Sequence, residues 1–116
     1  MFAVIYRFKL KPDQEKTYLV SWNKITDYFI AHRGALGSCL HKGEDGLWVA
    51  YSRWPDKATR DASWSQEKKI ADELPIDIQN VIKPIQEIKA QNQDMDQYEE
   101  ICLEMMEDKL LNPKKV

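Results

Sequence analysis

The chain has 116 residues, of which 43% are hydrophobic and 31% are charged, an ordinary composition for a single globular domain. Its formal net charge is −2 and no stretch gathers Lys and Arg, which argues against nucleic-acid binding because phosphates are neutralised by clustered positive charge. The longest apolar runs fall well short of a membrane span, and the opening MFAVIYRFKL does not resemble a secretion signal. We therefore expect a cytoplasmic protein with neither a nucleic acid nor a membrane as partner.

The chain opens with a predicted strand followed by a long helix. Over residues 2–10 every second side chain is apolar, and the alternate positions begin apolar and then become basic. Lys11-Pro12-Asp13 ends the strand, and apolar residues at helical spacing predict a helix over 13–33, with Gly34 as its stop. The stripe on this helix consists of Tyr18, Trp22, Ile25 and Phe29.

A hairpin and a second helix are expected next. Residues 35–42 and 47–54 read as strands around the turn 43–46. Asp56 then caps a helix over 57–71. This helix carries few apolar residues, so we expect it to lie over a surface rather than inside the core.

The last third of the chain contains one clear element and one ambiguous one. An apolar stripe predicts a helix beginning at Leu74, and Pro84 should kink or split it because proline lacks the backbone donor. Residues 91–97 form a polar connector. For residues 99–110, residue propensities favour a helix, whereas the alternation of Ile101, Leu103 and Met105 favours a strand.

If the last segment is a strand, the order becomes βαββαβ with an extra helix before the final strand. That order defines an α+β, ferredoxin-like fold, in which helices cover one face of a four-stranded antiparallel sheet. Neither face of the predicted strands is polar, so the uncovered face needs a partner, and the simplest partner is a second copy. We therefore expect a homodimer, with the domain over 1–111 and a short tail over 112–116.

The two cysteines, Cys39 and Cys102, are far apart in the sequence, and each stands in an apolar run. Neither a disulfide framework nor a C-x-x-C metal pair is present. We interpret both as small buried residues in a reducing compartment. The acidic residues near the end of the chain alternate along the predicted strand instead of converging on one point. We therefore interpret them as a solvated or interface strip and expect no metal site. They are Glu99, Glu100, Glu104, Glu107 and Asp108.

Several segments carry a family resemblance: the opening FAVIYRFKLKPD, the hairpin LGSCLHKGEDGLWVAYSRWPDK, Trp64, and the closing EEICLEMMEDKLL. In these the chain resembles the antibiotic-biosynthesis-monooxygenase-like (ABM-like) family of the dimeric α+β barrel superfamily. The resemblance implies that the last segment is a strand and that two sheets pair face to face into a barrel. It also implies a pocket in each subunit between its sheet and its own helices. Known activities of the family are cofactor-independent oxygenation of phenolic compounds and oxidative breakdown of haem.

The haem-degrading branch is the less favoured of these activities. That branch uses an Asn on the first strand, a Trp on the second helix and a His further along as the iron ligand. Here Tyr6 matches the Asn and Trp64 matches the Trp, but no His stands in the matching stretch 70–74. Haem iron needs a proximal ligand, which this stretch does not offer.

Cofactor-independent oxygenation needs a base, an apolar pocket and a donor to developing negative charge. We predict Tyr6 as the donor and His41 as the base, with Trp22, Tyr51 and Trp64 lining the substrate site. Each has an alternative reading. Tyr6 fits a core tyrosine, Trp22 a core residue of the first helix, and His41 an exposed histidine near the turn.

Two function classes therefore remain. The first is a monooxygenase, an oxidoreductase acting without a cofactor on a small apolar or phenolic compound. The second is a dimer without catalytic activity that binds a small molecule or serves as an accessory protein. A pocket that reaches Tyr6 and Trp64 would favour the first.

Overall fold

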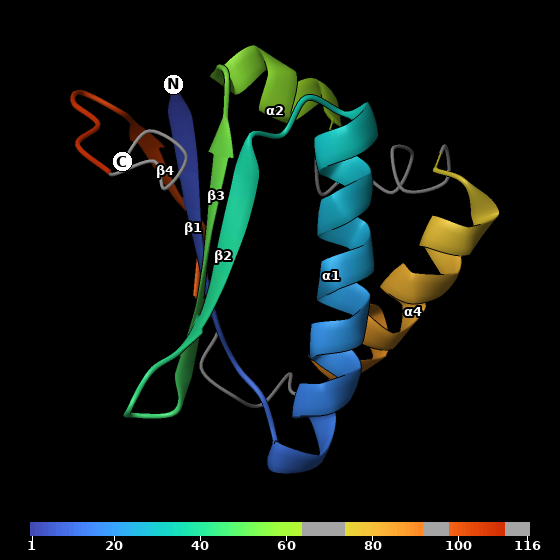
Figure 1. Cartoon of the computed structure of the whole chain (residues 1–116). Coiled ribbons are helices and arrows are strands. Elements are labelled where there is room, and N and C mark those ends of the chain that lie inside the picture. The colour runs from blue at the N-terminus through green and yellow to red at the C-terminus, as the bar shows by residue number, and fades with distance from the viewer. Residues whose placement is uncertain (64–73, 92–97, 111–116) are drawn as a thin grey trace.

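A computed structural model describes residues 1–63, 74–91 and 98–110 of the chain. The elements follow the predicted order, with strands at both ends of the described chain (Figure 1). They are β1 (Phe2–Lys9), the 3₁₀ turn η1 (Pro12–Gln14), α1 (Glu15–His32), β2 (Gly37–Lys42), β3 (Leu47–Trp54), α2 (Lys57–Ser63), α4 (Ile76–Gln91) and β4 (Ile101–Glu104). The predicted tail 112–116 and the residues of the second helix beyond Ser63 lie outside the described residues.

The four strands form one antiparallel sheet in the order β2-β3-β1-β4. The described helices all lie on one side of it (Figure 1). This is the predicted α+β, ferredoxin-like arrangement. β4 settles the ambiguous last segment as a strand, although it is shorter than the predicted 99–110. Helix-favouring residues become a strand here because the free edge of β1 supplies hydrogen-bond partners for their backbone, which outweighs local propensity.

The core lies between the sheet and α1. Phe2 and Val4 from β1 pack with Phe29 from α1 and Trp54 from β3, and Val4 is fully buried. The Phe29 and Trp54 rings meet at 65°, with their centroids 6.4 Å apart, a favourable edge-to-face geometry. A second apolar cluster attaches α4 to the other side of α1, so that α1 is sandwiched between the sheet and α4 (Figure 1).

The predicted turn and cap residues behave as expected. Gly34 ends α1 in the left-handed region with φ +79°, and a Cβ there would lie 3.0 Å from the Thr59 side chain. Asp56 caps α2, because its Oδ1 accepts a 2.7 Å hydrogen bond from the Thr59 backbone N–H.

Pro84 was predicted to kink or split its helix, and it does not split it, since α4 runs through Pro84 as one helix. Ile82 and Ile88 are buried on either side of the proline.

The prediction that the cysteines are buried is wrong. Cys39 and Cys102 are both exposed, because each stands on a strand at an edge of the sheet.

The face of the sheet opposite the helices carries apolar side chains from three strands. The register aligns Ile5 of β1 with Tyr51 of β3 on one side and with Ile101 of β4 on the other. Ile101 and Leu103 remain partly exposed. No described helix covers this outer face (Figure 1). The two apolar faces that the sequence predicts are therefore present, and the outer face has no cover among the described helices.

Within the described residues no helix has the length and apolarity to cross a membrane.

Candidate active site

The structure places the two predicted catalytic residues on opposite faces of the sheet. Tyr6 points toward the helices and packs against the core cluster that contains Phe29. His41 aligns with Val49, which aligns with Arg7, and side chains alternate along a strand, so His41 belongs to the outer face. His41 is exposed, and its Nδ1 lies 3.2 Å from the Val49 carbonyl oxygen. The predicted pairing of Tyr6 with His41 is therefore not formed within the chain.

The predicted substrate-binding residues are also divided. Trp22 is half-buried on α1, whereas Tyr51 lies on the outer face opposite Ile5. Trp64 lies outside the described residues. Only Tyr6 and Trp22 of the five predicted residues are thus on the helix-facing side in the part of the chain that the structure describes.

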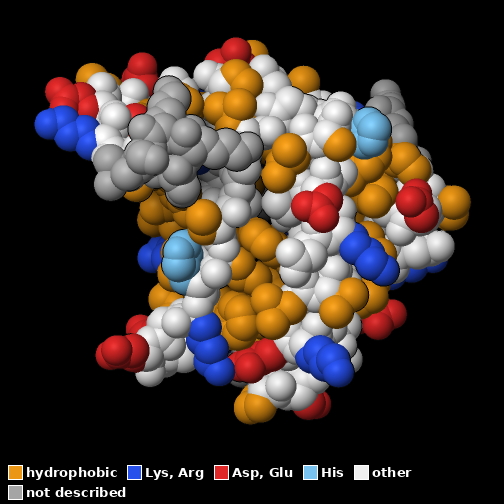
Figure 2. All heavy atoms as spheres, viewed as in Figure 1, with side chains coloured by type: hydrophobic (Ala, Val, Ile, Leu, Met, Phe, Trp, Pro, Cys, Tyr) orange, Lys and Arg blue, Asp and Glu red, His pale blue; other side chains and the backbone are white. Residues whose placement is uncertain are grey.

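Small side chains line the centre of the helix-facing side of the sheet. Ser38, Ala50 and Ser52 stand there, and the two serine hydroxyls are hydrogen-bonded to each other. Aromatic pairs between the sheet and α1 stand at both ends of this stretch: Phe8 with Tyr18, centroids 4.7 Å apart, and Phe29 with Trp54. Figure 2 shows hydrophobic side chains gathered in a hollow between the β2–β3 hairpin and α1. We call this region the central hollow.

Trp48 contributes an unused hydrogen-bond donor at the Phe8 end of the central hollow. Its side chain is buried, and its indole N–H has no partner among the described residues. Lys42 lies over the indole ring, 5.9 Å from its centroid, and forms a 2.8 Å ion pair with Glu15 of α1. A buried donor without an acceptor needs an explanation, and an oxygen atom of a bound ligand would provide one.

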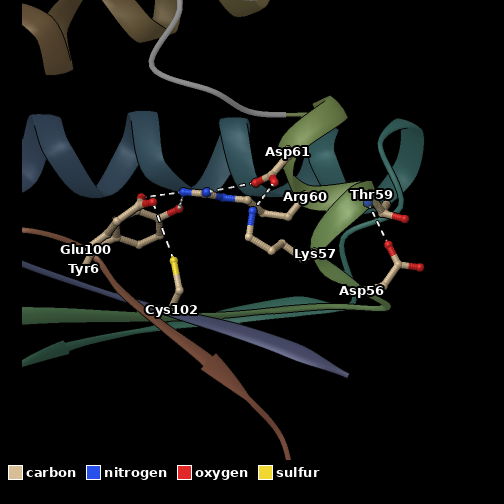
Figure 3. Close-up of polar contacts among 8 residues, drawn as sticks. All are labelled: Tyr6, Asp56, Lys57, Thr59, Arg60, Asp61, Glu100 and Cys102. Carbon is tan, nitrogen blue, oxygen red and sulfur yellow. Dashed lines mark hydrogen bonds and ion pairs between the residues drawn. The ribbon is translucent and has the colours of Figure 1, made fainter.

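A polar cluster joins Tyr6 to α2 and to the segment that leads into β4 (Figure 3). Arg60 of α2 donates a 3.4 Å hydrogen bond from Nη2 to the Tyr6 hydroxyl oxygen. The same nitrogen donates to Glu100, with which Arg60 forms an ion pair. Arg60 Nη1 also lies 3.2 Å from Asp61 Oδ1. The Arg60 side chain thus joins α2 to β1 and to the residue that precedes β4.

Burial and these charges act on the titration of the cluster. Burial raises the pKa of the Tyr6 hydroxyl, while the hydrogen bond and positive charge of Arg60 oppose that rise. Burial disfavours the Arg60 charge, but Tyr6 and Glu100 outweigh this effect and raise the pKa of the guanidinium. At neutral pH the site therefore holds a protonated tyrosine beside a charged Arg60–Glu100 pair.

The sequence reading missed Arg60 and misjudged Glu100. Glu100 was expected to be part of a solvated or interface strip, but it is half-buried and paired with Arg60. Arg60 and Ser63 are three residues apart, so they lie on the same face of α2, and both are buried. This spacing was the one sign in the sequence that Arg60 could face the inside of the molecule. No rule of composition would have selected an arginine for that position.

Cys102 is an exposed thiol whose surroundings disfavour the thiolate. Its Sγ donates a hydrogen bond to Glu100 Oε1 at 3.7 Å, and partial burial followed by the Glu100 charge raises the pKa of the thiol. Because the thiolate is the reacting form, alkylation of Cys102 at pH 7 should be slow and should accelerate only above the usual thiol range. Glu100→Gln removes the negative charge that helps to raise this pKa, so it should lower the midpoint and speed alkylation at pH 7 several-fold.

The measurement is the rate of iodoacetamide labelling by mass spectrometry in a Cys39→Ser background, across pH. Glu99→Gln is the matched control, because it removes a neighbouring exposed carboxylate that the Cys102 thiol does not contact. Equal labelling rates for Glu100→Gln and Glu99→Gln would contradict the effect of Glu100 on the Cys102 thiol.

In the described ranges no group of three or more His, Cys, Asp or Glu side chains converges as a metal site would require.

Comparison with known proteins fits this architecture. The sequence profile of the antibiotic biosynthesis monooxygenase family matches residues 1–68, more than half of the chain. The chain therefore belongs to this family, and the predicted resemblance is confirmed. No curated protein sequence matches the chain.

Solved structures similar to this chain share its fold over nearly their whole length. Rv0793 from Mycobacterium tuberculosis has a TM-score of 0.63 at 18% identity, with 94% of this chain and 98% of that chain covered. A monooxygenase from the gene ActVA-Orf6 of Streptomyces coelicolor, solved with the ligand nanaomycin D, has a TM-score of 0.62 at 15% identity, with 96% and 92% covered. A putative antibiotic biosynthesis monooxygenase from Deinococcus radiodurans has a TM-score of 0.63 at 10% identity, with 97% and 99% covered. At such identities the likeness establishes the fold.

Proposed function

We propose that this protein is a cofactor-independent monooxygenase that oxidises a small apolar, phenolic compound bound in the central hollow. The observation that carries the proposal is Tyr6, a protonated hydroxyl held by Arg60 on the helix-facing side of the sheet. The central hollow is mostly apolar, with a few polar groups that could orient a ligand, as is usual for small-molecule sites. Nanaomycin D in the Streptomyces coelicolor neighbour supports a ligand of this general kind.

The proposed reaction takes all its electrons from the substrate. A phenolic compound with an activated CH₂ group loses a proton to water, and the resulting carbanion adds to O₂. Protonation gives a hydroperoxide, which loses water to leave a carbonyl. The balance is CH₂ + O₂ → C=O + H₂O, so that one oxygen atom is retained and the other leaves as water. Tyr6 donates a hydrogen bond to the negative charge that develops on the substrate oxygen.

Tyr6→Phe tests this role. Removing one donor to a developing oxyanion should lower kcat roughly 10²-fold, with a smaller change in KM. The measurement is oxygen uptake with anthrone and a hydroxyanthrone as substrates, both of which carry the activated CH₂ group that the proposed reaction needs. Tyr28→Phe, a half-buried tyrosine of α1 whose ring packs on Phe29 and His32, is the matched control and should leave kcat unchanged. Equal activity of the Tyr6→Phe variant and the unmodified protein would refute the role of Tyr6.

A second candidate function is a small-molecule-binding protein without turnover. It is favoured by the absence of an unpaired base beside Tyr6 among the described residues, because Glu100 is held by Arg60 and His41 lies on the other face. Binding of these compounds without oxygen uptake would support this function and reject the first.

The proposed assembly is a homodimer formed through the outer faces of two sheets. Support comes from the apolar row of Ile5, Tyr51 and Ile101, which no described helix covers. A face-to-face dimer would bury this row in each copy. We also propose a cytoplasmic location, which is supported by two exposed cysteines that are not joined to each other.

A further inference from the structure

Arg60 is an unusual residue to bury beneath α2, a helix at the surface. It is only 8% exposed, and its Nε is buried without a partner among the described residues. Burying a guanidinium is costly, and an apolar side chain of similar size would commonly serve stability as well or better. The position of Arg60 is therefore better explained by what it contacts than by the stability that it adds.

The contacts of Arg60 fix the hydrogen-bonding role of Tyr6. A phenol oxygen accepts from one direction and donates its own proton in another. Since Arg60 Nη2 donates to the Tyr6 oxygen, the guanidinium leaves the proton of Tyr6 to find an acceptor elsewhere. Within the described residues no side chain or carbonyl accepts that proton.

We propose that Arg60 and Glu100 are positioning residues: Arg60 orients and polarises the Tyr6 hydroxyl so that it donates to an oxygen atom of the ligand, and Glu100 holds Arg60 in place and balances its charge. This inference rests on the proposed function for the identity of the ligand. The arrangement of the three side chains exists in the free protein, so it can be tested without substrate. Figure 3 shows the Arg60 side chain reaching from α2 to both partners.

The charges around Tyr6 determine the expected direction of each change. Arg60 approaches Tyr6 from α2, and Tyr18 approaches it from α1. Cys102 approaches from β4, and Glu100 from the residue before β4. On β3 the residue opposite Tyr6 is Ala50, which carries no charge. Removing the Arg60 charge should therefore make Tyr6 harder to ionise, and removing the Glu100 charge should make it easier.

The test is titration of Tyr6 by fluorine NMR of protein labelled with 3-fluorotyrosine, which ionises at a milder pH than tyrosine. Tyr6→Phe identifies the resonance among those of the five tyrosines. Relative to the unmodified protein, Arg60→Gln should raise the Tyr6 midpoint by about one pH unit or more, as expected for loss of an adjacent opposite charge. Glu100→Gln keeps a side-chain oxygen that accepts from Arg60 and removes only the charge, so it should lower the midpoint. Arg60→Lys keeps the positive charge and should retain most of the normal value.

The design separates a positioning role from a merely structural one, because the two charge removals should move the Tyr6 midpoint in opposite directions. If Arg60→Gln fails to fold, Arg60→Lys and Glu100→Gln keep the cluster polar, and the downward shift expected in Glu100→Gln then decides the test. An unchanged Tyr6 midpoint in folded Glu100→Gln protein, or in folded Arg60→Gln protein, would overturn the inference. Absence of oxygen uptake together with the expected midpoint shifts would reject only the monooxygenase.

Discussion

Replacing Trp54 with alanine should lower the free energy of unfolding by about 3–5 kcal/mol. Trp54 is 5% exposed, shares a core cluster with Phe2 and Phe29, and contacts the Phe29 ring where β3 meets α1. Its removal leaves a cavity at the contact between the sheet and its main helix. A domain of this size has about 5–15 kcal/mol of stability in total, so the variant should be close to unfolding at physiological temperature.

The measurement is urea denaturation at a fixed protein concentration, because an oligomer gains stability with concentration. Leu36→Ala is the control, since Leu36 is 50% exposed and should change the stability by less than about 1 kcal/mol. Trp54→Phe refines the result. It keeps an aromatic ring and removes an indole N–H that has no partner among the described residues, so it should cost much less than alanine. Similar losses for Trp54→Ala and Leu36→Ala would show that this contact is not central to the core.

Replacing Ile5 with aspartate should convert the proposed dimer into monomers. Ile5 is the central apolar residue of the outer face, between Tyr51 and Ile101. In a face-to-face dimer each copy would bury this carboxylate without a partner, at a cost of several kcal/mol per chain. Sedimentation velocity at micromolar concentration should give the mass of a single chain for this variant and twice that mass for the unmodified protein.

Val20→Asp is the matched control. Val20 is 51% exposed on α1, on the other side of the sheet, and its substitution should leave the dimer intact. A dimeric Ile5→Asp protein would show that copies associate through another surface. A monomeric unmodified protein would reject the dimer itself, and with it the explanation of the apolar outer face.

The strands and helices could be read from the sequence because their signals are local. The alternation over 2–10, the stripe from Tyr18 to Phe29, and the stop at Gly34 each depend on neighbours a few residues apart. The one ambiguous segment, 99–110, was a conflict between a local preference and a long-range pairing. The edge of β1 resolved it, and that edge lies nearly the whole chain away in sequence.

The candidate site was predictable only in part. Tyr6 could be chosen because it matches a site position of the family that the chain resembles, on the first strand. His41 was chosen for its chemistry, and the alternation of side chains along β2 then placed it on the other face. Whether two strands present given residues on one face depends on their register, which turn geometry and packing determine together.

By itself the sequence determined an α+β domain with two apolar sheet faces, and its resemblance to the ABM-like family made the last segment a strand and singled out Tyr6. The tertiary structure alone decided that Arg60 and Glu100 meet at Tyr6 and that His41 does not. The physical reason is the range of the interactions. Periodicity is set by the geometry of the chain over a few residues, whereas a buried ion pair between α2 and the residue before β4 exists only once the sheet has brought them together.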